Sequence, residues 1–261
     1  MSNITMQSPL VNFTLIEETE DLIVVNKPAG VLVHPTKPGG PVTLWDSVSE
    51  LLAYEIANGG QVSIINRLDR ETSGLTLIAK SAAAARQCSI SMARRQIAKE
   101  YLAIVTGWPQ PDTFSVDEPL VRAGAVAESP IWLKRGVHPE GAVALTHFTV
   151  LERWHHGAFG PLALIRAIPV TGRTHQIRVH LSHYGFPVVG DKIYGPDEQW
   201  YLYFVKHGWT PEIERALHLS RHALHSASLS IIYDERAFRW QCGMPADMQE
   251  LMPDANSSGH Y

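Results

Sequence analysis

Short runs of apolar and β-branched residues follow one another along most of this sequence, separated by brief segments that contain Gly and Pro. Few helical patterns interrupt these runs, so strands do not alternate strictly with helices. Strands in consecutive groups predict an α+β fold with a mixed, largely antiparallel sheet flanked by helices. The expected strands lie at residues 11–16, 22–25, 31–34, 62–65, 75–79, 100–107, 129–134, 144–154, 161–170, 222–232 and 236–240.

Helical spacing and capping residues mark the other elements. Thr43 caps a segment with helical spacing of its apolar residues, and Ser81 caps an alanine-rich segment that runs to about Arg95. Gly185 follows a further segment, as expected of a residue just past a helix end. The predicted helices lie at residues 44–58, 82–95, 174–184 and 245–252, with two short amphipathic helices within 197–217.

The length of 261 residues fits one large domain or two small ones, and an apolar share of 45% allows a sizeable core. We expect a single domain over residues 11–252. The two ends, 1–10 and 253–261, are polar and are expected to be flexible tails. No apolar run approaches the roughly 18 residues of a membrane span, and no signal peptide is visible. Two cysteines cannot build a disulfide framework, so we expect a cytoplasmic protein. We also expect a monomer.

Cofactor motifs are missing from the sequence. Neither G-x-G-x-x-G after a strand nor G-x-x-x-x-G-K-[ST] occurs, so we expect no nucleotide cofactor. His175, His180 and His183 lie close together, but no carboxylate or cysteine completes a ligand set. We therefore expect hydrogen-bonded or surface histidines, no metal and no cofactor.

The loop RLDRETSG places Asp69 between Arg67 and Arg70, with apolar runs on both sides. One interpretation is an ordinary turn, in which the carboxylate caps a backbone group and the arginines are solvated. The other is a carboxylate kept ionised by nearby guanidinium groups. Such a carboxylate can act as a nucleophile or can stabilise a cationic carbon.

A second segment, TGRTHQIRVHLSHYG, contains a predicted helix on which Ile177, Leu181 and Tyr184 share one face. Arg178 borders that face and is expected to be partly buried. A buried arginine needs an acidic partner, because an uncompensated buried charge is costly. Asp69 is the candidate partner.

The stretch from Arg67 to Glu100 is basic, with seven Lys and Arg against three Asp and Glu, a local charge of +4 in a chain of net charge −4. Such a run is often a solvated face. Here Tyr101 follows it, and an aromatic ring beside basic residues suits the stacking of an unpaired base. A local RNA-binding groove is therefore compatible with the acidic total.

Taken together, these segments resemble the RluA-like family of pseudouridine synthases, in its short form without an S4 domain. The family motif H-R-L-D-R-x-T-S-G corresponds to residues 66–74, with Asn66 in place of histidine. The motif N-K-P-x-G-x-x-x-H corresponds to residues 26–34, and K-x-Y-x-A-x-x-x-G to 99–107. T-G-R-x-H-Q-I-R-x-H is intact at 171–180, and GDKIYG and an L-H-A-type element follow.

The resemblance implies the pseudouridine synthase fold with a central cleft for RNA and the active site. It also implies roles for single residues: Asp69 as the catalytic aspartate, Tyr101 as the ring that stacks on the uracil, and Arg178 as the partner of Asp69. Leu224, Arg67 and Leu68 would line the base pocket. The residues expected to contact RNA are Arg70, Arg86, Arg94, Arg95, Lys99, Lys27, Arg173 and His175.

The activity implied is isomerisation of specific uridines in tRNA or 23S rRNA, as part of tRNA or rRNA processing. Two alternatives stay open at this point. One is a non-catalytic RNA-binding or ribosome-assembly protein that retains the fold, against which intact Asp69, Tyr101 and Arg178 argue. The other is an unrelated aspartate-nucleophile enzyme such as a phosphatase, which would need an aspartate pair and a metal site.

Overall fold

The computed structural model describes residues 10–253, which form two compact units. Unit 1 contains residues 10–97 and 230–242, and unit 2 contains residues 98–229 and 243–253. The predicted tails at 1–9 and 254–261 lie outside the described residues. The single domain predicted over 11–252 stays a prediction.

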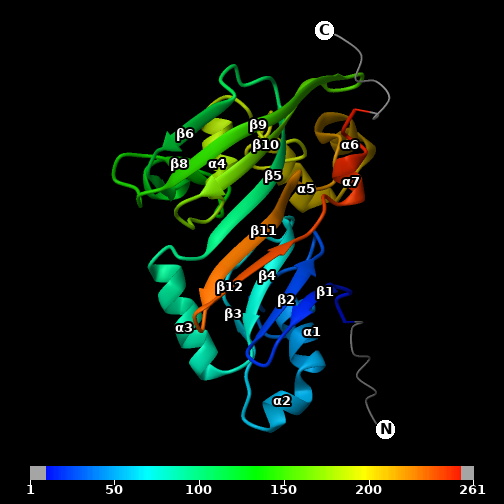
Figure 1. Ribbon diagram of the computed structural model, residues 1–261. Coiled ribbons are helices and arrows are strands. Elements are labelled where there is room, and N and C mark those ends of the chain that lie inside the picture. The colour runs from blue at the N-terminus through cyan, green and yellow to red at the C-terminus, as the bar shows by residue number, and fades with distance from the viewer. Residues whose placement is uncertain (1–9, 254–261) are drawn as a thin grey trace, which may run out of the picture. The chain divides into compact units, whose positions relative to one another are not determined.

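Unit 1 is built on antiparallel strands (Figure 1). β2 pairs with β1 on one side and with β4 on the other, and β3 pairs with β4. β12 pairs with β11, the strand with which the chain re-enters this unit. The elements of unit 1 are β1 (Thr14–Glu18), β2 (Leu22–Lys27), α1 (Leu44–Leu51), α2 (Ala53–Ala57), β3 (Ser63–Ile64), β4 (Ser73–Ala79), α3 (Ala82–Ala93), the end of β11 (Leu224–Tyr233) and β12 (Arg236–Gln241).

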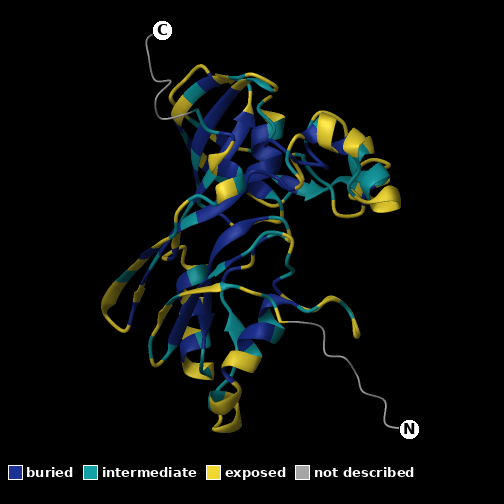
Figure 2. Ribbon diagram, turned by 90° about the vertical axis from the view of Figure 1, so that its right-hand side faces the viewer, coloured by how far each residue is buried: buried dark blue, intermediate teal, exposed yellow. Residues whose placement is uncertain are grey.

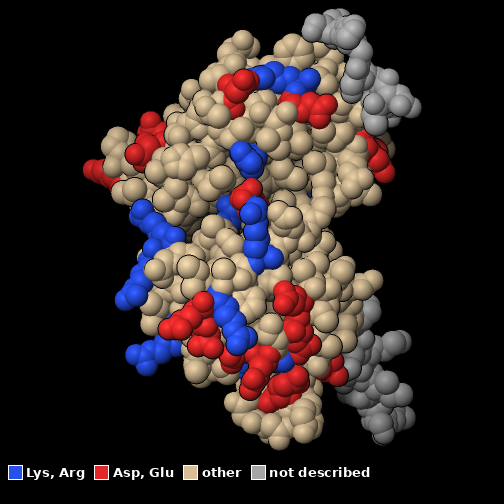
Figure 3. Space-filling model, in the orientation of Figure 1, with Lys and Arg blue, Asp and Glu red and all other residues tan. Residues whose placement is uncertain are grey.

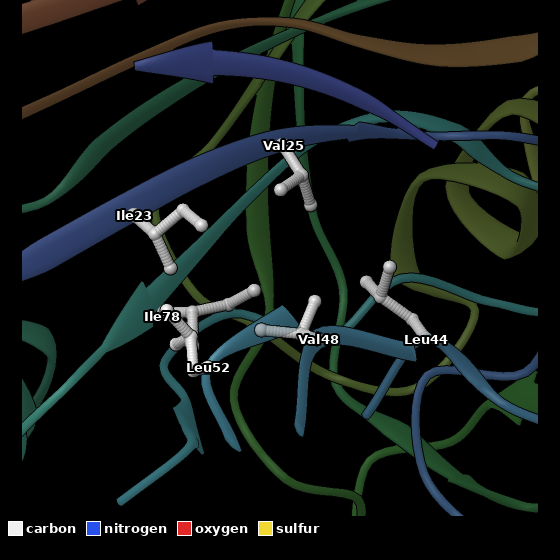
Figure 4. Packing of buried hydrophobic residues seen from close by; sticks show 6 residues of the cluster. All are labelled: Ile23, Val25, Leu44, Val48, Leu52 and Ile78. Atoms are coloured by element: carbon white, nitrogen blue, oxygen red, sulfur yellow. The ribbon is translucent and has the colours of Figure 1, made fainter. Parts of the chain in front are cut away.

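The core of unit 1 lies between β2, β4 and α1. Figure 4 shows the side chains of Ile23, Val25, Leu44, Val48, Leu52 and Ile78 gathered there. Thr43 caps α1 as predicted, in a reciprocal capping box with Asp46. Burial of this apolar face fixes α1 against the sheet.

The apolar face of the first helix is narrower than its spacing predicts. Leu51 is 50% exposed and Ile56 is 39% exposed. The helical path is interrupted at Leu52, and α2, which follows, has no buried residue. Because the helix is interrupted at Leu52, Ile56 does not continue the buried apolar row formed by Leu44 and Val48.

Two of the predicted strands do not form. Residues 31–34 run without ladder pairing, because the carbonyls of Leu32 and Val33 accept hydrogen bonds from the first N–H groups of α1. Residues 129–134 form turns, in which the Lys134 N–H donates to the Ile131 carbonyl. Of that segment Ile131 alone is fully buried.

Unit 2 contains the antiparallel strand order β5–β10–β9–β6 and a separate two-stranded ribbon of β7 and β8. Figure 2 shows the buried strands of this unit and the exposed loops at its periphery. Its strands are β5 (Ala98–Thr106), β6 (Thr113–Asp117), β7 (Leu120–Arg122), β8 (Arg135–Val137), β9 (Leu145–His156), β10 (Gly160–Pro169) and the start of β11. Its helices are η1 (Ala123–Ala125), α4 (Gln176–His183), α5 (Gln199–His207), α6 (Pro211–Leu217) and α7 (Ala246–Gln249).

The central helix of unit 2 is α4, and it is buried from Gln176 to Leu181. Val179 packs in a cluster with Leu120, Ile131 and Tyr194. The predicted helix over 174–184 is thus confirmed, but it begins two residues later, because His175 adopts a left-handed backbone conformation with φ of 60°. Tyr184, predicted on its apolar face, is exposed.

The predicted α+β class with a largely antiparallel sheet and flanking helices is confirmed. The pairings β1–β2, β2–β4 and β3–β4 in unit 1, and β5–β10, β9–β10, β6–β9 and β7–β8 in unit 2, are antiparallel. The predicted central cleft stays a prediction. Among the residues that the structure describes, no helix combines the length and apolar character needed to cross a membrane.

Candidate active site

The loop that carries Asp69 joins β3 to β4 in unit 1. The Thr72 N–H donates to the Asp69 carbonyl at 3.1 Å, which closes a tight turn. Leu68 beside Asp69 is buried, Asp69 is half-buried, and Arg67 and Arg70 are exposed. The loop therefore holds its backbone in place while the carboxylate stays within reach of solvent.

Asn66, which replaces the family histidine, ties the start of this loop to β4. Its amide Nδ2 donates to the Leu75 carbonyl at 3.0 Å, and its Oδ1 accepts from the Leu77 N–H at 2.7 Å. Asn66 is buried, so both bonds are shielded from water. The side-chain amide of Asn66 thus takes the place of a backbone peptide group and joins the two ends of the Asp69 loop.

Lys27 ties the other side of the loop to the NKPAG turn. Its ammonium donates to the carbonyls of Pro28 at 2.8 Å, Val31 at 3.0 Å and Arg70 at 3.2 Å. Arg70 returns a bond through its Nε to the Gly30 carbonyl at 2.9 Å. Hydrogen bonds in both directions thus join the NKPAG turn to the loop that carries Asp69.

This geometry corrects the expectation that Lys27 contacts RNA. Its side chain is fully buried, so its charge does not reach the surface on which a phosphate would lie. A buried ammonium needs hydrogen-bond acceptors, and three carbonyl oxygens supply them here. Lys27 holds the Asp69 loop from within.

The basic residues of α3 do reach the surface. Arg86 lies on α3, Arg94 caps its end, and Arg95 follows with a left-handed φ of 58°. All three are exposed, and Figure 3 shows Lys and Arg side chains over this helix. Lys99, at the start of β5 in unit 2, is half-buried, and that burial lowers its pKa. The predicted RNA contacts at these four positions stay predictions.

Tyr101 and Leu224 lie in unit 2, on β5 and at the start of β11, and both are buried. Tyr101 is opposite Ala167 of β10 in the antiparallel register. Arg221 holds the Leu224 carbonyl through Nη1 at 3.2 Å, while its Nε and Nη2 bind the Asp247 carboxylate at 2.7 and 2.8 Å. An arginine anchored on α7 thus fixes the backbone of the predicted base-pocket leucine.

Arg178 is buried on α4 and binds Asp191 through two parallel hydrogen bonds. The Nε donates to Oδ2 at 2.6 Å and Nη2 donates to Oδ1 at 2.9 Å. Asp191 Oδ1 also accepts from the backbone N–H groups of Ile193 and Tyr194. Burial opposes ionisation of Asp191, but the Arg178 guanidinium outweighs it, so the pKa of Asp191 lies well below its ordinary range.

This pair was not foreseen from the sequence. Burial of Arg178 and its need for a carboxylate were correctly predicted, but the partner within unit 2 is Asp191 of the GDKIYG segment. A carboxylate shortly after the helix in a Gly-bounded segment was the available signal. Pairing of Arg178 with Asp69 concerns two different units and stays a prediction.

Two glycines shape the turn that presents Asp191. A Cβ on Gly190 would lie 2.0 Å from the Arg221 carbonyl oxygen, and one on Gly195 would lie 2.2 Å from the Asp191 carbonyl oxygen. Gly190 also has a φ of 76°, in the region that favours glycine. Any side chain at either position would displace the backbone around the Arg178–Asp191 pair.

The histidines of the T-G-R-x-H-Q-I-R-x-H segment serve as hydrogen-bonding groups. His175 Nδ1 lies 2.8 Å from the Tyr194 hydroxyl, and His180 lies between the Thr146 hydroxyl and the Glu118 carbonyl. Arg173 is exposed and donates through Nε to the Val143 carbonyl. Within residues 10–253, no group of three or more His, Cys, Asp or Glu is placed to hold a metal ion.

His222 is a buried residue of this region that sequence reasoning missed. Burial, reinforced by the Arg178 charge, places its pKa well below the ordinary value, so its imidazole is neutral. The sequence offers no signal for this, because the burial of His222 and the nearby charge of Arg178 depend on distant segments of unit 2.

Comparison with known proteins gives matches over most of the chain. The chain matches the family described as RNA pseudouridylate synthase over residues 21–183. It is 38% identical to an uncharacterized RNA pseudouridine synthase of Chloroflexus aurantiacus, over 90% of this chain and 67% of the relative. It is 34% identical to ribosomal large subunit pseudouridine synthase D of Yersinia pestis, over 91% of this chain and 69% of that one.

Solved structures agree on the fold. The human RNA pseudouridylate synthase domain containing 1 aligns with a TM-score of 0.70 at 23% identity, covering 97% of this chain and 95% of that one. The human domain containing 4 protein aligns with a TM-score of 0.69 at 25% identity, covering 90% of both chains. Because the family match spans more than half of the chain and relatives above 30% identity cover most of it, the chain belongs to the RNA pseudouridylate synthases and is a pseudouridine synthase, an isomerase that rearranges a nucleotide internally.

Proposed function

We propose that Asp69 is the catalytic aspartate of this enzyme and that its target is a uridine in large-subunit ribosomal RNA. The observation that carries the catalytic assignment is the construction of the Asp69 loop. Asn66 and Lys27 anchor its backbone from two sides, while the Asp69 side chain is left half-buried. A rigid backbone under an accessible carboxylate is what a nucleophile or charge-stabilising group requires.

The reaction moves bonds within one nucleotide. The N1–C1′ bond breaks, the uracil turns, and C5 bonds to C1′; the C5 proton is released and N1 gains one. Positive character develops at C1′ when the glycosidic bond breaks, and an adjacent carboxylate stabilises or traps it. Attack of Asp69 on C1′, its attack on C6, and its removal of a ribose proton are three routes with the same products.

The target uridine must leave its stack to meet Asp69. In this proposal Tyr101 stacks on the flipped uracil, and Leu224 and Leu68 bound the base pocket with Arg67 at its edge. Arg178 pairs with Asp69 and orients its carboxylate. The exposed cations expected to follow the RNA backbone are Arg70, Arg86, Arg94, Arg95 and Arg173, together with the half-buried Lys99 and His175.

The large ribosomal subunit is favoured as the source of the target because several relatives at 33–34% identity carry the name ribosomal large subunit pseudouridine synthase D. tRNA is the second candidate. Mapping pseudouridines in 23S rRNA and tRNA from cells with and without the gene distinguishes them. Loss of a site in 23S rRNA supports the proposal, whereas loss confined to tRNA contradicts the choice of target.

Substitution of Asp69 tests the catalytic assignment. Asp69→Ala and Asp69→Asn should abolish tritium release from RNA labelled with 5-³H-uridine, with RNA affinity and thermal unfolding near the wild type. Asp112→Asn is the matched control, because the Asp112 side chain is 80% exposed and lies outside this loop. Turnover by Asp69→Ala comparable with that of the control would disprove the role of Asp69.

A further inference from the structure

The β7–β8 ribbon and its connecting loop form a surface of unit 2 to which the proposed function gives no role. Trp132, in this loop, is 73% exposed, and Val126 and Leu133 are also exposed. Single exposed apolar residues are common on proteins, but an exposed indole within an ordered loop costs hydrophobic free energy that its burial would recover. The loop therefore presents an aromatic platform to solvent.

A guanidinium lies on this platform. The Cζ of Arg122 is 3.9 Å from the centroid of the Trp132 ring, within the distance of a cation–π contact. Arg122 is the last residue of β7, so the strand fixes its backbone. The Arg122 guanidinium is consequently stacked on the Trp132 indole.

A second arginine lies directly opposite the first. Arg122 and Arg135 are cross-strand partners in the β7–β8 register. Cross-strand neighbours share one face of a ribbon, and like charges placed opposite each other destabilise it. Neither arginine forms an ion pair with a carboxylate anywhere in residues 10–253, whereas neighbouring Lys134 pairs with Glu198.

The ribbon is anchored to the helix that carries Arg178. The Arg135 N–H donates to the Tyr194 hydroxyl at 2.8 Å, and the Tyr194 ring lies 5.0 Å from the Arg178 Cζ. Leu120 of β7 and Ile131 of the loop pack with Val179 of α4. The platform is thus held at a fixed position relative to the Arg178–Asp191 pair.

We propose that this ribbon binds an unpaired nucleotide of the RNA, other than the target uridine, with its base on Trp132 and its phosphate between Arg122 and Arg135. Two arginines that are cross-strand partners on this ribbon favour an anion, and the exposed indole favours a flat apolar partner. An unpaired nucleotide supplies both at a short fixed spacing, and RNA is the substrate of this enzyme family. The proposal holds whether or not Asp69 has its assigned role.

Binding of short RNAs tests the platform. The probes are a fluorescein-labelled single-stranded oligouridine of 12 nucleotides and a blunt 12-base-pair RNA duplex. Trp132→Ala should weaken binding of the single strand by about 5- to 150-fold, the equivalent of removing one base stack, and leave duplex binding nearly unchanged. Trp132→Phe keeps an aromatic ring and should retain most of the affinity, which separates stacking from a folding defect.

Salt titrations test the arginines. Arg122→Gln and Arg135→Gln should each reduce the slope of log affinity against log salt for the single strand by about 0.7. Tyr54→Ala and Arg236→Gln are matched controls, since Tyr54 is 80% exposed on α2 and Arg236 is exposed on β12. Neither control should change affinity or slope.

Photocrosslinking locates the contact. Oligouridine that carries one 5-iodouridine should crosslink to the peptide that contains Trp132, and Arg122→Gln should reduce the yield. Equal loss of single-strand and duplex binding in Trp132→Ala, or no loss of either, would overturn the proposal. So would concentration-dependent self-association that Trp132→Ala abolishes, because it would identify the platform as a contact between two copies of the chain.

Discussion

The buried pair of Arg178 and Asp191 shows how much depends on single residues in unit 2. Two charges are held out of water by two parallel hydrogen bonds and by two backbone donors. Such a pair is costly to form, but it is costlier to break, because the partner left behind stays buried with its charge. The pair therefore fixes the orientation of the guanidinium more than it adds to net stability.

Arg178→Ala should destabilise the protein by about 3–5 kcal/mol, because it leaves the Asp191 carboxylate buried without its partner. Arg178→Lys should recover only part of the loss, since an ammonium cannot reproduce the two-point contact. Urea unfolding at neutral pH measures both. Arg215→Ala is the control, since the Arg215 side chain is 72% exposed, and it should cost less than about 0.5 kcal/mol.

The same variants examine the predicted pairing with Asp69. If Arg178 also pairs with Asp69, its loss leaves that carboxylate without its guanidinium partner, so kcat should fall even in variant protein that is fully folded. A wild-type kcat in folded Arg178→Ala would contradict this pairing, although the Asp191 contact would stand.

Asn66→Ala should destabilise the protein by about 1–3 kcal/mol and lower kcat more than it changes RNA affinity. The substitution leaves the Leu75 carbonyl and the Leu77 N–H buried without their partner, and it loosens the base of the Asp69 loop. Asn66→His, which restores the family residue, keeps one donor and one acceptor and should remain active. Thermal unfolding measures the loss of stability, and single-turnover rates measure the effect on catalysis. A wild-type kcat in Asn66→Ala would show that the Asp69 loop does not need the Asn66 hydrogen bonds.

At the scale of elements, α3 offers a surface on which RNA contact can be tested without disturbing the core. Arg94 and Arg95 are exposed at its end, and the buried residues of α3 are Ala84, Cys88 and Ser91. The helix packs through small side chains, so charge changes at its end leave that packing intact.

Charge reversal with Arg94→Glu and Arg95→Glu should weaken binding to all RNA sequences and flatten its salt dependence. Removal of one phosphate-binding side chain should lower the log–log slope by about one unit. Fluorescence anisotropy over a range of salt concentrations measures this, with Arg236→Glu on β12 as the control. An unchanged slope would mean that the end of α3 faces away from bound RNA.

At the scale of the whole molecule, the buried ionisable groups set how stability varies with pH. His222 is buried and neutral, and burial also lowers the pKa of His180. Unfolded histidine takes up a proton below about pH 6.5, while these folded ones do so only at lower pH, so stability falls as pH decreases from about 6.5.

The carboxylates extend this decline to lower pH. Burial raises the pKa values of Asp191 and Asp247, but Arg178 and Arg221 outweigh it and keep both below the ordinary range. Their stabilising contribution is complete above about pH 4 and is lost as pH falls through the folded pKa.

The urea midpoint should therefore fall continuously from pH 7 to pH 3. The decline below about pH 4 should be shallower in Asp191→Asn, even though that variant is less stable at pH 7. Asp112→Asn, at an exposed position, should keep the wild-type slope. A midpoint that stays constant between pH 5 and pH 3 in the wild-type protein would contradict these assignments.

Local sequence determined most of the elements of this protein. The caps at Thr43 and Ser81, the ends of α4 and α5 at Gly185 and Gly208, and the long strands β9 and β10 follow from propensity and spacing alone. These signals are readable because a cap or a periodic face involves residues a few positions apart. The motifs likewise identified the family, since each one is contiguous.

Tertiary structure alone decided which groups meet and which reach the surface. Arg178 needed a carboxylate, but spacing could not select Asp191, whose place depends on a turn that Gly190 and Gly195 permit. The basic side chain of Lys27 was predicted to contact phosphate, but at the end of β2 it is buried among carbonyl oxygens. Trp132 was predicted to lie in a strand, but it lies in a loop that leaves it exposed and in contact with the Arg122 guanidinium. Burial and ion pairing depend on segments that are distant in the chain. The sequence therefore predicts that a buried charge needs a partner, but only the tertiary structure determines which residue that partner is.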